Sequence, residues 1–536
     1  MALRGAPALA SRWLAALVVA AGLLGSGAAQ APGAAAQSAA PDVGVASRGA
    51  AGRGFLAPPE HGVWYQVFVR SFQDSDGDGV GDLPGLRSRL PYLAELGVTG
   101  LWLMPVHPSP SYHGYDVTDH YAVNPEYGTL DDLLGVLHDA HALGMRVILD
   151  LVPNHTSSQH PWFRAALAGD PAYRDRYVWS DDPPPWRGTF GGSAWHAADG
   201  AYYLGLFSPD MPDLNHADPA VEREVHDVAA FWLGLGFDGF RVDAIQHVVE
   251  GEGGVIANAP ENYAWVARFQ AHVDAVAPGA VVLGETWTDM PAIARYHTEA
   301  GLHAATDYPL YQDLVRALLT RSAADLAFGL AQAEAMYPPG AMRATFTSNH
   351  DQGRLATRLS VPRRDERRLA LAAGLLLTLP GTPFLYYGEE VGMTDGPGAF
   401  DVGKRTPMPW EPVPGLGFTT GEPWTDPGEA APGVTVAEQR RDPTSLWWRY
   451  RRMIALRRTH PALYRGATRV LDAGQRAVLA LERDAGDERL FVVANLGARD
   501  LAVELPDVPE GAVDVLTGRA FDGTVPALTL LVLGTP

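Results

Sequence analysis

The chain has no cysteine among its 536 residues. Disulfide bonds, thiolate catalysis and cysteine-ligated zinc are therefore excluded. Positive charge is also scarce, because 41 lysine and arginine residues stand against 62 acidic ones and give a formal net charge of −21. Nucleic acids and anionic membranes attract basic surfaces, so partners of these two kinds are not expected.

A long hydrophobic run is missing from the start of the chain. The apolar stretch at residues 13–24 follows two arginines and is shorter than the roughly 20 residues of a membrane-spanning helix. Small residues follow it, and the three alanines at 34–36 fit a cleavage site. This pattern predicts a secretory signal at 1–36 and a flexible leader at 37–58, with an uncleaved membrane anchor as the alternative. The mature protein is then secreted or periplasmic, with no membrane attachment.

The remaining composition is typical of a globular protein with a sizeable core, since 47% of the residues are hydrophobic and 19% are charged. Short apolar runs alternate with amphipathic segments such as 83–96, 130–143 and 220–235. Eight such units predict a (β/α)₈ barrel built from residues 59–152 and 213–461. The candidate strands are 63–68, 98–104, 146–152, 237–243, 281–285, 304–308, 344–349 and 383–387.

Two segments depart from the barrel rhythm. Residues 153–212, between the third and fourth strands, are rich in aromatic residues, proline and aspartate, which is typical of a functional loop or a small inserted domain. Most of its aromatic side chains are expected to form their own small core, and some could stack on sugar rings. Short alternating runs after residue 461 predict a C-terminal antiparallel β-sandwich domain at 462–536.

The stretch 236–247 is a buried strand that ends in charge. Arg241 and Asp243 lie two residues apart and so point to the same side of a strand. Such a pair could merely tie strands together. However, three further strands end in similar residues, at DLVPNH (150–155), GE (284–285) and NHD (349–351). Because barrel strands meet at one mouth, these four ends predict a catalytic site there.

Paired carboxylates at a barrel mouth indicate cleavage of glycosidic bonds. One carboxyl must be ionised and the other protonated, so their surroundings must differ. Asp243 has Arg241 beside it, which favours the charged form of a nucleophile. Glu285 has Trp287 near it in sequence and no adjacent cation, which favours the neutral form of a general acid.

These motifs resemble those of the α-amylase family of retaining glycoside hydrolases. DLVPNH, GFRVD (239–243), GE and NHD stand in the family's order and spacing, and MPDLN (211–215) matches a further motif at the end of the family's inserted domain. The resemblance covers roughly residues 60–460. It implies that Asp351 is the third essential acid, which grips sugar hydroxyls at subsite −1, while Asp150 matches an acid that is mainly structural. The substrate-binding residues implied by the resemblance are His113, Tyr115, Asp150, His155, Arg241, His350 and Arg354.

A cluster of alternating acids, DSDGDGVGD, occupies residues 74–82. Oxygen ligands at positions 1, 3, 5, 7 and 9 resemble the start of a calcium loop, although Gly85 stands where an EF-hand has its glutamate. The loop resembles the calcium site after the first barrel strand of oligo-1,6-glucosidases, which implies Ca²⁺ as cofactor; a metal-free acidic turn is the alternative. The expected ligands are Asp74, Asp76, Asp78, Asp82 and the carbonyl of Val80.

A second calcium site is also implied by the resemblance. Asn154, Asp213 and His247 match positions that hold calcium between the barrel and the inserted domain in many α-amylases. A fourth ligand is not identifiable from the sequence.

Signals of specificity within the family are mixed. YHGY (112–115) resembles α-amylases, since exo-acting α-glucosidases tend to carry an acid at the position of His113 that blocks subsite −2. Ala244 resembles enzymes that prefer α-1,4 bonds, whereas RTPM (405–408) resembles α-glucosidases. We expect a monomer that cleaves internal α-1,4 bonds of starch or maltooligosaccharides. An exo-α-glucosidase, an oligo-1,6-glucosidase and a trehalose-synthase-like transglucosylase are the enzymatic alternatives. A non-catalytic glucan-binding or transporter-associated protein is disfavoured, because all three acids are present.

Overall fold

The computed structural model describes residues 58–251, 253–359, 366–428 and 432–535. The predicted signal at 1–36 and the leader up to residue 57 lie outside these ranges. Within them, a search for helices long and apolar enough to span a bilayer finds none.

Eight parallel strands close into a barrel in the order β1-β11-β10-β9-β8-β7-β3-β2. The predicted fold class is thereby confirmed, and every predicted strand overlaps an observed one. All but one of the residues in these strands are buried, as expected for a barrel covered by helices outside and filled by side chains inside. The strands are β1 (Trp64–Val67), β2 (Gly100–Leu103), β3 (Arg146–Leu151), β7 (Gly239–Val242), β8 (Val281–Gly284), β9 (Ala304–Thr306), β10 (Met342–Thr345) and β11 (Thr382–Tyr386).

The helices between these strands begin and end with recognisable caps. Thr129 and Asp132 form a reciprocal capping box at the start of α2, and Asp218 accepts a backbone N–H at the start of α5. Gly236 ends α5 with a φ of 110°, a conformation that favours glycine, and the chain then turns directly into β7. The helices of the barrel are α1 (Leu83–Leu96), α2 (Leu130–Ala142), α5 (Pro219–Leu235), α6 (Pro260–Val276), α7 (Met290–Thr298), α8 (Tyr308–Thr320), α9 (Ala324–Met336), α10 (Leu355–Arg358), α11 (Glu366–Thr378), α12 (Val436–Arg441) and α13 (Leu446–Thr459).

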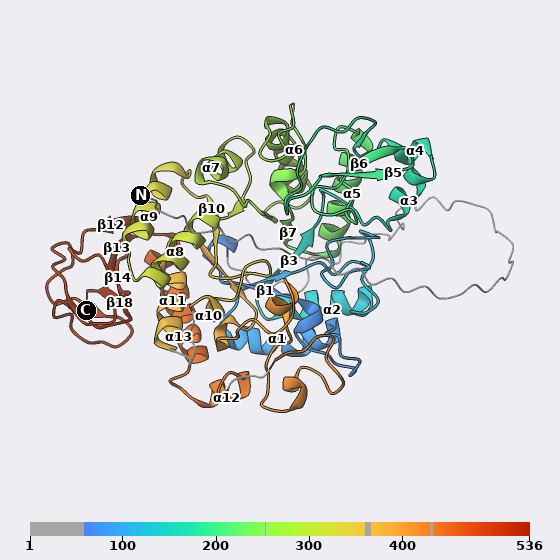
Figure 1. The fold of residues 1–536 in the computed structure, drawn as a ribbon. Coiled ribbons are helices and arrows are strands. Elements are labelled where there is room, and N and C mark those ends of the chain that lie inside the picture. Colours follow the sequence, from blue (N-terminus) through green and yellow to red (C-terminus); the bar gives the residue numbers. More distant parts are fainter. Residues whose placement is uncertain (1–57, 252, 360–365, 429–431, 536) are drawn as a thin grey trace, which may run out of the picture. The chain divides into compact units, whose positions relative to one another are not determined.

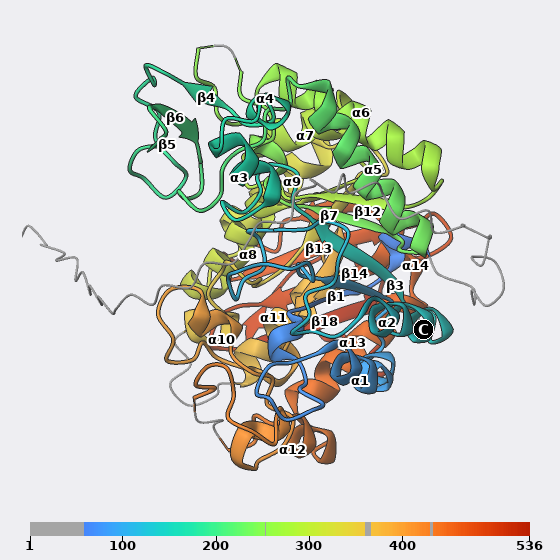
Figure 2. The same cartoon turned by 90° about the vertical axis from the view of Figure 1, so that its right-hand side faces the viewer.

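An inserted domain lies between β3 and β7. It contains α3 (Pro161–Leu167), α4 (Pro171–Arg174) and a small antiparallel sheet of β4 (Trp179–Ser180), β6 (Ala201–Leu204) and β5 (Trp195–Ala198). Phe163, Tyr177 and Tyr203 pack in one small core of this domain, and Trp195 packs in another. In Figures 1 and 2 these elements group together beside α5 and α6.

The chain ends in an antiparallel domain that packs on α9, α11 and α14 (Pro461–Arg465). Its main sheet has the order β12-β13-β14-β18-β16, and β15 pairs with β17. Alternate residues of β13 and β14 give the sheet two apolar faces, because Leu479 and Val492 join the main core while Ala480 and Val493 join a separate one. The strands are β12 (Ala467–Leu471), β13 (Val478–Asp484), β14 (Arg489–Asn495), β15 (Leu501–Ala502), β16 (Val513–Asp514), β17 (Thr524–Val525) and β18 (Thr529–Gly534).

Candidate active site

One buried arginine lies at the centre of the carboxylates at the barrel mouth. β3, β7 and β8 are neighbours in register, so that Asp150 pairs with Arg241 and Arg241 with Leu283. The Arg241 guanidinium donates from Nη1 to Asp150 Oδ1 at 2.8 Å and to Asp243 Oδ1 at 2.6 Å. Its Nη2 lies 2.8 Å from Glu285 Oε2. The barrel therefore unites the strand ends as the sequence predicts.

The electrostatic distinction between Asp243 and Glu285 expected from the sequence is wrong. Glu285 is not without a cation, because closing β8 against β7 places Arg241 against both carboxyls. Burial raises the pKa of each carboxyl, and Arg241 opposes that rise in both. Arg241 thus cannot decide which of the two carries a proton.

Each of these two carboxyl groups keeps one oxygen available. Asp243 uses Oδ1 for Arg241, while Glu285 uses Oε2 for Arg241 and for the Ala244 N–H at 3.0 Å. Asp243 Oδ2 and Glu285 Oε1 have no hydrogen-bond partner in the described ranges, and the two side chains are 11% and 12% exposed. A reacting group can therefore reach both carboxyls from the barrel mouth, whereas Asp150 is fully buried and cannot be reached.

A chain of hydrogen bonds joins β1, the loop after β2 and the end of β10. Gln66 Nε2 donates to His350 Nδ1 at 2.7 Å, which leaves the ring proton on Nε2. That nitrogen lies 2.7 Å from the Tyr115 hydroxyl, which in turn donates to Asp150 Oδ2 at 3.1 Å. Since burial holds the pKa of His350 well below its usual value, the ring stays neutral. The network fixes Tyr115 and His350 as rigid walls beside the acids.

Asp351 is gripped by residues from the loop after β11. Arg405 Nη2 lies 3.0 Å from Asp351 Oδ1, and its Nε donates to the carbonyl of His350 at 3.1 Å. Lys404 Nζ donates to the backbone carbonyl of Asp351 at 2.7 Å. The sequence offered RTPM only as a signal of specificity, so the contact of Arg405 and Lys404 with the third acid was missed.

Other predicted binding residues occupy different surroundings. His113 Nδ1 accepts the Tyr115 N–H at 3.1 Å, and its side chain is 23% exposed. His155 is buried against Phe207, and burial lowers its pKa to about 3. Arg354 donates to the carbonyl of Tyr387 at 2.6 Å and, within the described residues, makes no contact with the three acids.

A stacked aromatic pair, of which only Trp287 is exposed, follows the neighbouring strands β8 and β9. The ring of Trp287 stacks on that of Tyr308, with centroids 4.7 Å apart and an interplanar angle of 5°. Trp287 is 47% exposed, while the Tyr308 hydroxyl accepts a hydrogen bond from Asn349 Nδ2 at 3.2 Å. Tyr308 was missed by the sequence analysis, because the stretch after β9 matched none of the motifs considered there.

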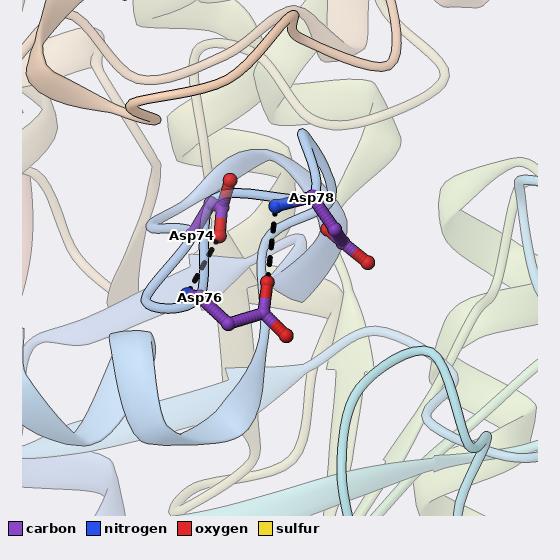
Figure 3. Close-up of side chains that lie close together, drawn as sticks. All are labelled: Asp74, Asp76 and Asp78. Atoms are coloured by element: carbon purple, nitrogen blue, oxygen red, sulfur yellow. Dashed lines mark hydrogen bonds between the residues drawn. The ribbon is translucent and has the colours of Figure 1, made fainter.

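The acidic loop between β1 and α1 brings three of its aspartates together (Figure 3). Asp74, Asp76 and Asp78 offer carboxylate oxygens that lie within 4.8 Å of one another. Asp74 also accepts the N–H groups of Gly77 at 2.7 Å and Gly79 at 2.9 Å. Three carboxylates at this spacing repel one another unless a cation lies among them, so their donor set fits Ca²⁺.

Asp82 has a different place from the one expected of a ligand. Its carboxylate accepts from Ser75 N at 2.9 Å and from Gly85 N at 2.6 Å, and so caps the start of α1. It does not belong to the group formed by the other three aspartates. The Val80 N–H donates to Asp78 Oδ1 at 2.7 Å, which ties the backbone at Val80 to one of the three aspartates.

The residues expected at a second calcium site are only partly brought together. Asn154 hydrogen-bonds to the buried carboxylate of Asp213. Burial raises the pKa of Asp213, and the charge of Glu250 raises it further. His247 Nδ1 instead donates to the carbonyl of Ile256 at 2.7 Å. Glu250 is an acid near this cluster that the sequence analysis missed.

Comparisons with known proteins show to which family the chain is similar. Residues 66–466 match the family model described as the alpha-amylase catalytic domain. Alpha-amylase 3 of Dictyoglomus thermophilum is 36% identical, covering 82% of this chain and 85% of that protein. Trehalose synthase of Thermus thermophilus is 38% identical over 84% of this chain, which spans 52% of that longer protein.

A solved structure extends the likeness to the fold. The alpha-amylase from H. orenii shares 34% identity and a TM-score of 0.78, with 89% of this chain and all of that chain covered. The family's barrel, its inserted domain and its terminal sheet are all present in the described residues. Together with the matched catalytic-domain model, these findings show that the chain belongs to the α-amylase family of glycoside hydrolases.

Proposed function

We propose that the protein is a retaining α-glucan hydrolase that cleaves internal α-1,4 bonds of starch and maltooligosaccharides. The observation that carries this proposal is the single guanidinium of Arg241, which contacts both Asp243 and Glu285 and leaves each with one available oxygen. A retaining mechanism needs two carboxyls only about 5–5.5 Å apart. A shared guanidinium and the bond from Ala244 N–H to Glu285 support such a short separation.

In this proposal Asp243 Oδ2 attacks the anomeric carbon while the Glu285 carboxyl gives its proton to the departing oxygen. Water then enters on the side of Glu285, which takes back a proton as the covalent intermediate is hydrolysed. Asp351 holds hydroxyl groups of the reacting sugar, and Arg405 and His350 fix its carboxylate. Tyr115 and His350 form the walls that keep bulk water from the reacting carbon.

The test is release of reducing ends from soluble starch, together with NMR of the anomer formed first. Retention predicts an α-anomer from the α-linked substrate. The Asp243→Asn and Glu285→Gln variants should each lose at least about 10⁴-fold in activity while keeping their melting temperature. A β-anomer, or a fully active Asp243→Asn variant, would refute the mechanism.

A second candidate is an exo-acting α-glucosidase or a transglucosylase. Asp401 and Arg405 lie near enough to His113 for their charges to act on its imidazole. The loop after β11 therefore brings a carboxylate near the position where exo-acting relatives carry an acid. Similarity to a trehalose synthase at 38% identity adds support. Amylose viscosity followed against reducing ends separates the candidates. A fast fall in viscosity supports internal cleavage, whereas slow loss with glucose as the only early product supports the exo-acting enzyme.

We also propose that Asp74, Asp76, Asp78 and the carbonyl of Val80 bind Ca²⁺. The close approach of three carboxylate oxygens supports this proposal. The ion would hold the loop between β1 and α1 rather than take part in the reaction. Secretion or periplasmic export and a monomeric state complete the proposal, and they are testable by N-terminal sequencing of the exported protein and by light scattering.

A further inference from the structure

Lys404 is the only lysine among the 536 residues. Arginine supplies every other permanent positive side-chain charge, so a general need for positive charge does not explain why residue 404 is a lysine. An ammonium is a compact tetrahedral donor with three N–H groups, whereas a guanidinium is a planar fork. Among side chains, only lysine offers three N–H donors that point in divergent, non-planar directions from a single atom.

Two of the three directions are taken by the protein itself. Nζ donates to the carbonyl of Asp351 at 2.7 Å and to Asp401 Oδ1 at 2.6 Å. The third N–H has no partner among the residues that the structure describes, and 23% of the side chain is exposed. The ammonium is therefore held by two hydrogen bonds, while one N–H of this partly exposed side chain keeps no partner among the described residues.

The backbone around Lys404 is fixed as well. Tyr386 donates its hydroxyl to the Lys404 carbonyl at 3.1 Å, and Gly396 N bonds to Gly403 O at 2.7 Å across the loop. Lys404 lies in the short helix η5 (Val402–Arg405), and the Arg405 side chain of the same helix grips Asp351. A donor that moves little loses little entropy when it binds a ligand.

The place of Lys404 around the barrel indicates which part of a ligand it meets. The loop after β11 adjoins β1, and β1 adjoins β2, which is followed by Tyr112 and His113. Arg405 lies over the Tyr112 ring at 5.8 Å. Glu285 and Trp287 follow β8, which lies opposite β1 in the closed barrel. The leaving part of the substrate faces Glu285, so Lys404 faces the part that the enzyme retains.

We propose that Lys404 is a specificity-determining residue that donates its third N–H to a hydroxyl of the glucosyl unit at subsite −2. The assignment rests on the proposed function. It implies that the enzyme gains transition-state stabilisation from a second retained sugar, since contacts remote from the reacting bond raise turnover. A charge-assisted hydrogen bond of this kind is typically worth tenfold or more in kcat/KM.

Two chromogenic substrates separate this role from simple support of Asp351. p-Nitrophenyl α-glucoside places one sugar on the retained side, and p-nitrophenyl α-maltoside places two. The Lys404→Met variant should lose kcat/KM on both substrates, because Lys404 also holds the backbone carbonyl of Asp351, but the loss on the maltoside should be at least about tenfold greater than the loss on the glucoside. Equal losses on both substrates would mean that Lys404 only positions Asp351, and would overturn the assignment.

A labelling experiment tests the same contact without replacing Lys404. An amine-acylating reagent can modify only Lys404 and the N-terminal amine, which serves as an internal reference. In the Glu285→Gln variant, saturating maltopentaose should slow acylation of Lys404 at least fivefold and leave the N-terminal amine unchanged. Tryptophan fluorescence reports whether the sugar is bound.

The outcomes of the labelling experiment are distinct. Unchanged acylation of Lys404 while fluorescence shows bound maltopentaose would refute the contact. Absence of any binding to the Glu285→Gln variant, together with absence of activity of the parent protein on starch, would refute the proposed function and the assignment with it. The Lys404→Arg variant keeps the charge but not the tetrahedral donor, so it should recover less than half of the loss on the maltoside.

Discussion

Replacing Arg483 should show how the terminal domain is fastened to the barrel. Arg483 lies in β13 and is 1% exposed. Its Nη1 donates to Thr378 O at 2.8 Å, at the end of α11, and its Nη2 donates to Leu463 O and Gly466 O, both at 3.1 Å. Arg457 binds neighbouring carbonyls, among them Leu379 O at 3.3 Å. These two arginines donate hydrogen bonds to backbone carbonyls near the end of α11, where the helix offers no further N–H partner.

The expected magnitude comes from two opposing effects. Burial, assisted by Arg343, lowers the pKa of Arg483 to about 10 from 12.5. At about 1.36 kcal/mol per pKa unit, the buried charge costs roughly 3 kcal/mol. The Arg483→Met variant removes that cost but leaves three buried carbonyls unpaired, at about 1–3 kcal/mol each and roughly 6 kcal/mol together. The net loss of stability is therefore about 3 kcal/mol.

The assay is thermal unfolding at a fixed scan rate, beside the matched variant Arg489→Met in β14. Arg489 is 58% exposed and pairs with Glu482 and Asp484 at the surface, so its loss should cost about 1 kcal/mol at most. A cost of 3 kcal/mol corresponds to a fall of roughly 3 °C in melting temperature for a chain of this size. An Arg483→Met protein as stable as the Arg489→Met protein would refute the reasoning.

Four further predictions follow from the site and its surroundings. The Asp243→Asn variant should lose nearly all activity on starch with an unchanged circular dichroism spectrum, and retained activity would exclude it as nucleophile. EDTA should lower the melting temperature and calcium restore it, and Asp76→Ala should weaken that response; indifference to the chelator would make the loop a metal-free turn. Arg241 lowers the pKa of Asp243 and Glu285 against the rise from burial, so Arg241→Met should move the acidic limb of the pH–rate profile to higher pH, and an unmoved limb would contradict this. Burial lowers the pKa of His160 to about 3, so the folded state holds this ring neutral, and stability is lost as the pH falls below 6.5. The free energy of unfolding of the His160→Gln variant should therefore rise by about 2 kcal/mol relative to that of the parent between pH 7 and pH 5, as measured by urea unfolding.

The barrel was predictable because its strands are short apolar runs closed by charged motifs. Burial on both faces of β3 demands an apolar run, and its polar end can lie only at the mouth. The convergence of Asp150, Arg241, Asp243 and Glu285 followed from strand order alone. Local pattern and global fold agree at these positions, which is where prediction from a single sequence succeeds.

The errors arose where partners come from distant segments. Glu285 has no cation near it in sequence, yet Arg241 reaches it across one strand spacing. Asp82 shares the alternating spacing of the acidic loop, but it stands directly before the predicted segment 83–96 and caps α1. Arg405 and Lys404 stand more than 50 residues after Asp351 and meet it only because β10 and β11 are neighbours. Spacing describes local geometry, whereas these contacts are set by closure of the barrel.

The distribution of charge at the mouth explains why one arginine can serve two acids. Arg241 carries one positive charge and contacts Asp150, Asp243 and Glu285. When Glu285 is protonated, these four side chains together keep one net negative charge. Lys404 and Arg405 together balance Asp351 and Asp401. The unbalanced charge is therefore confined to the side of Asp243. Glycosidic cleavage passes through a cationic, oxocarbenium-like transition state, which that excess charge stabilises more than the neutral substrate. A second cation beside Asp243 would cancel the effect, and the described residues contain none there.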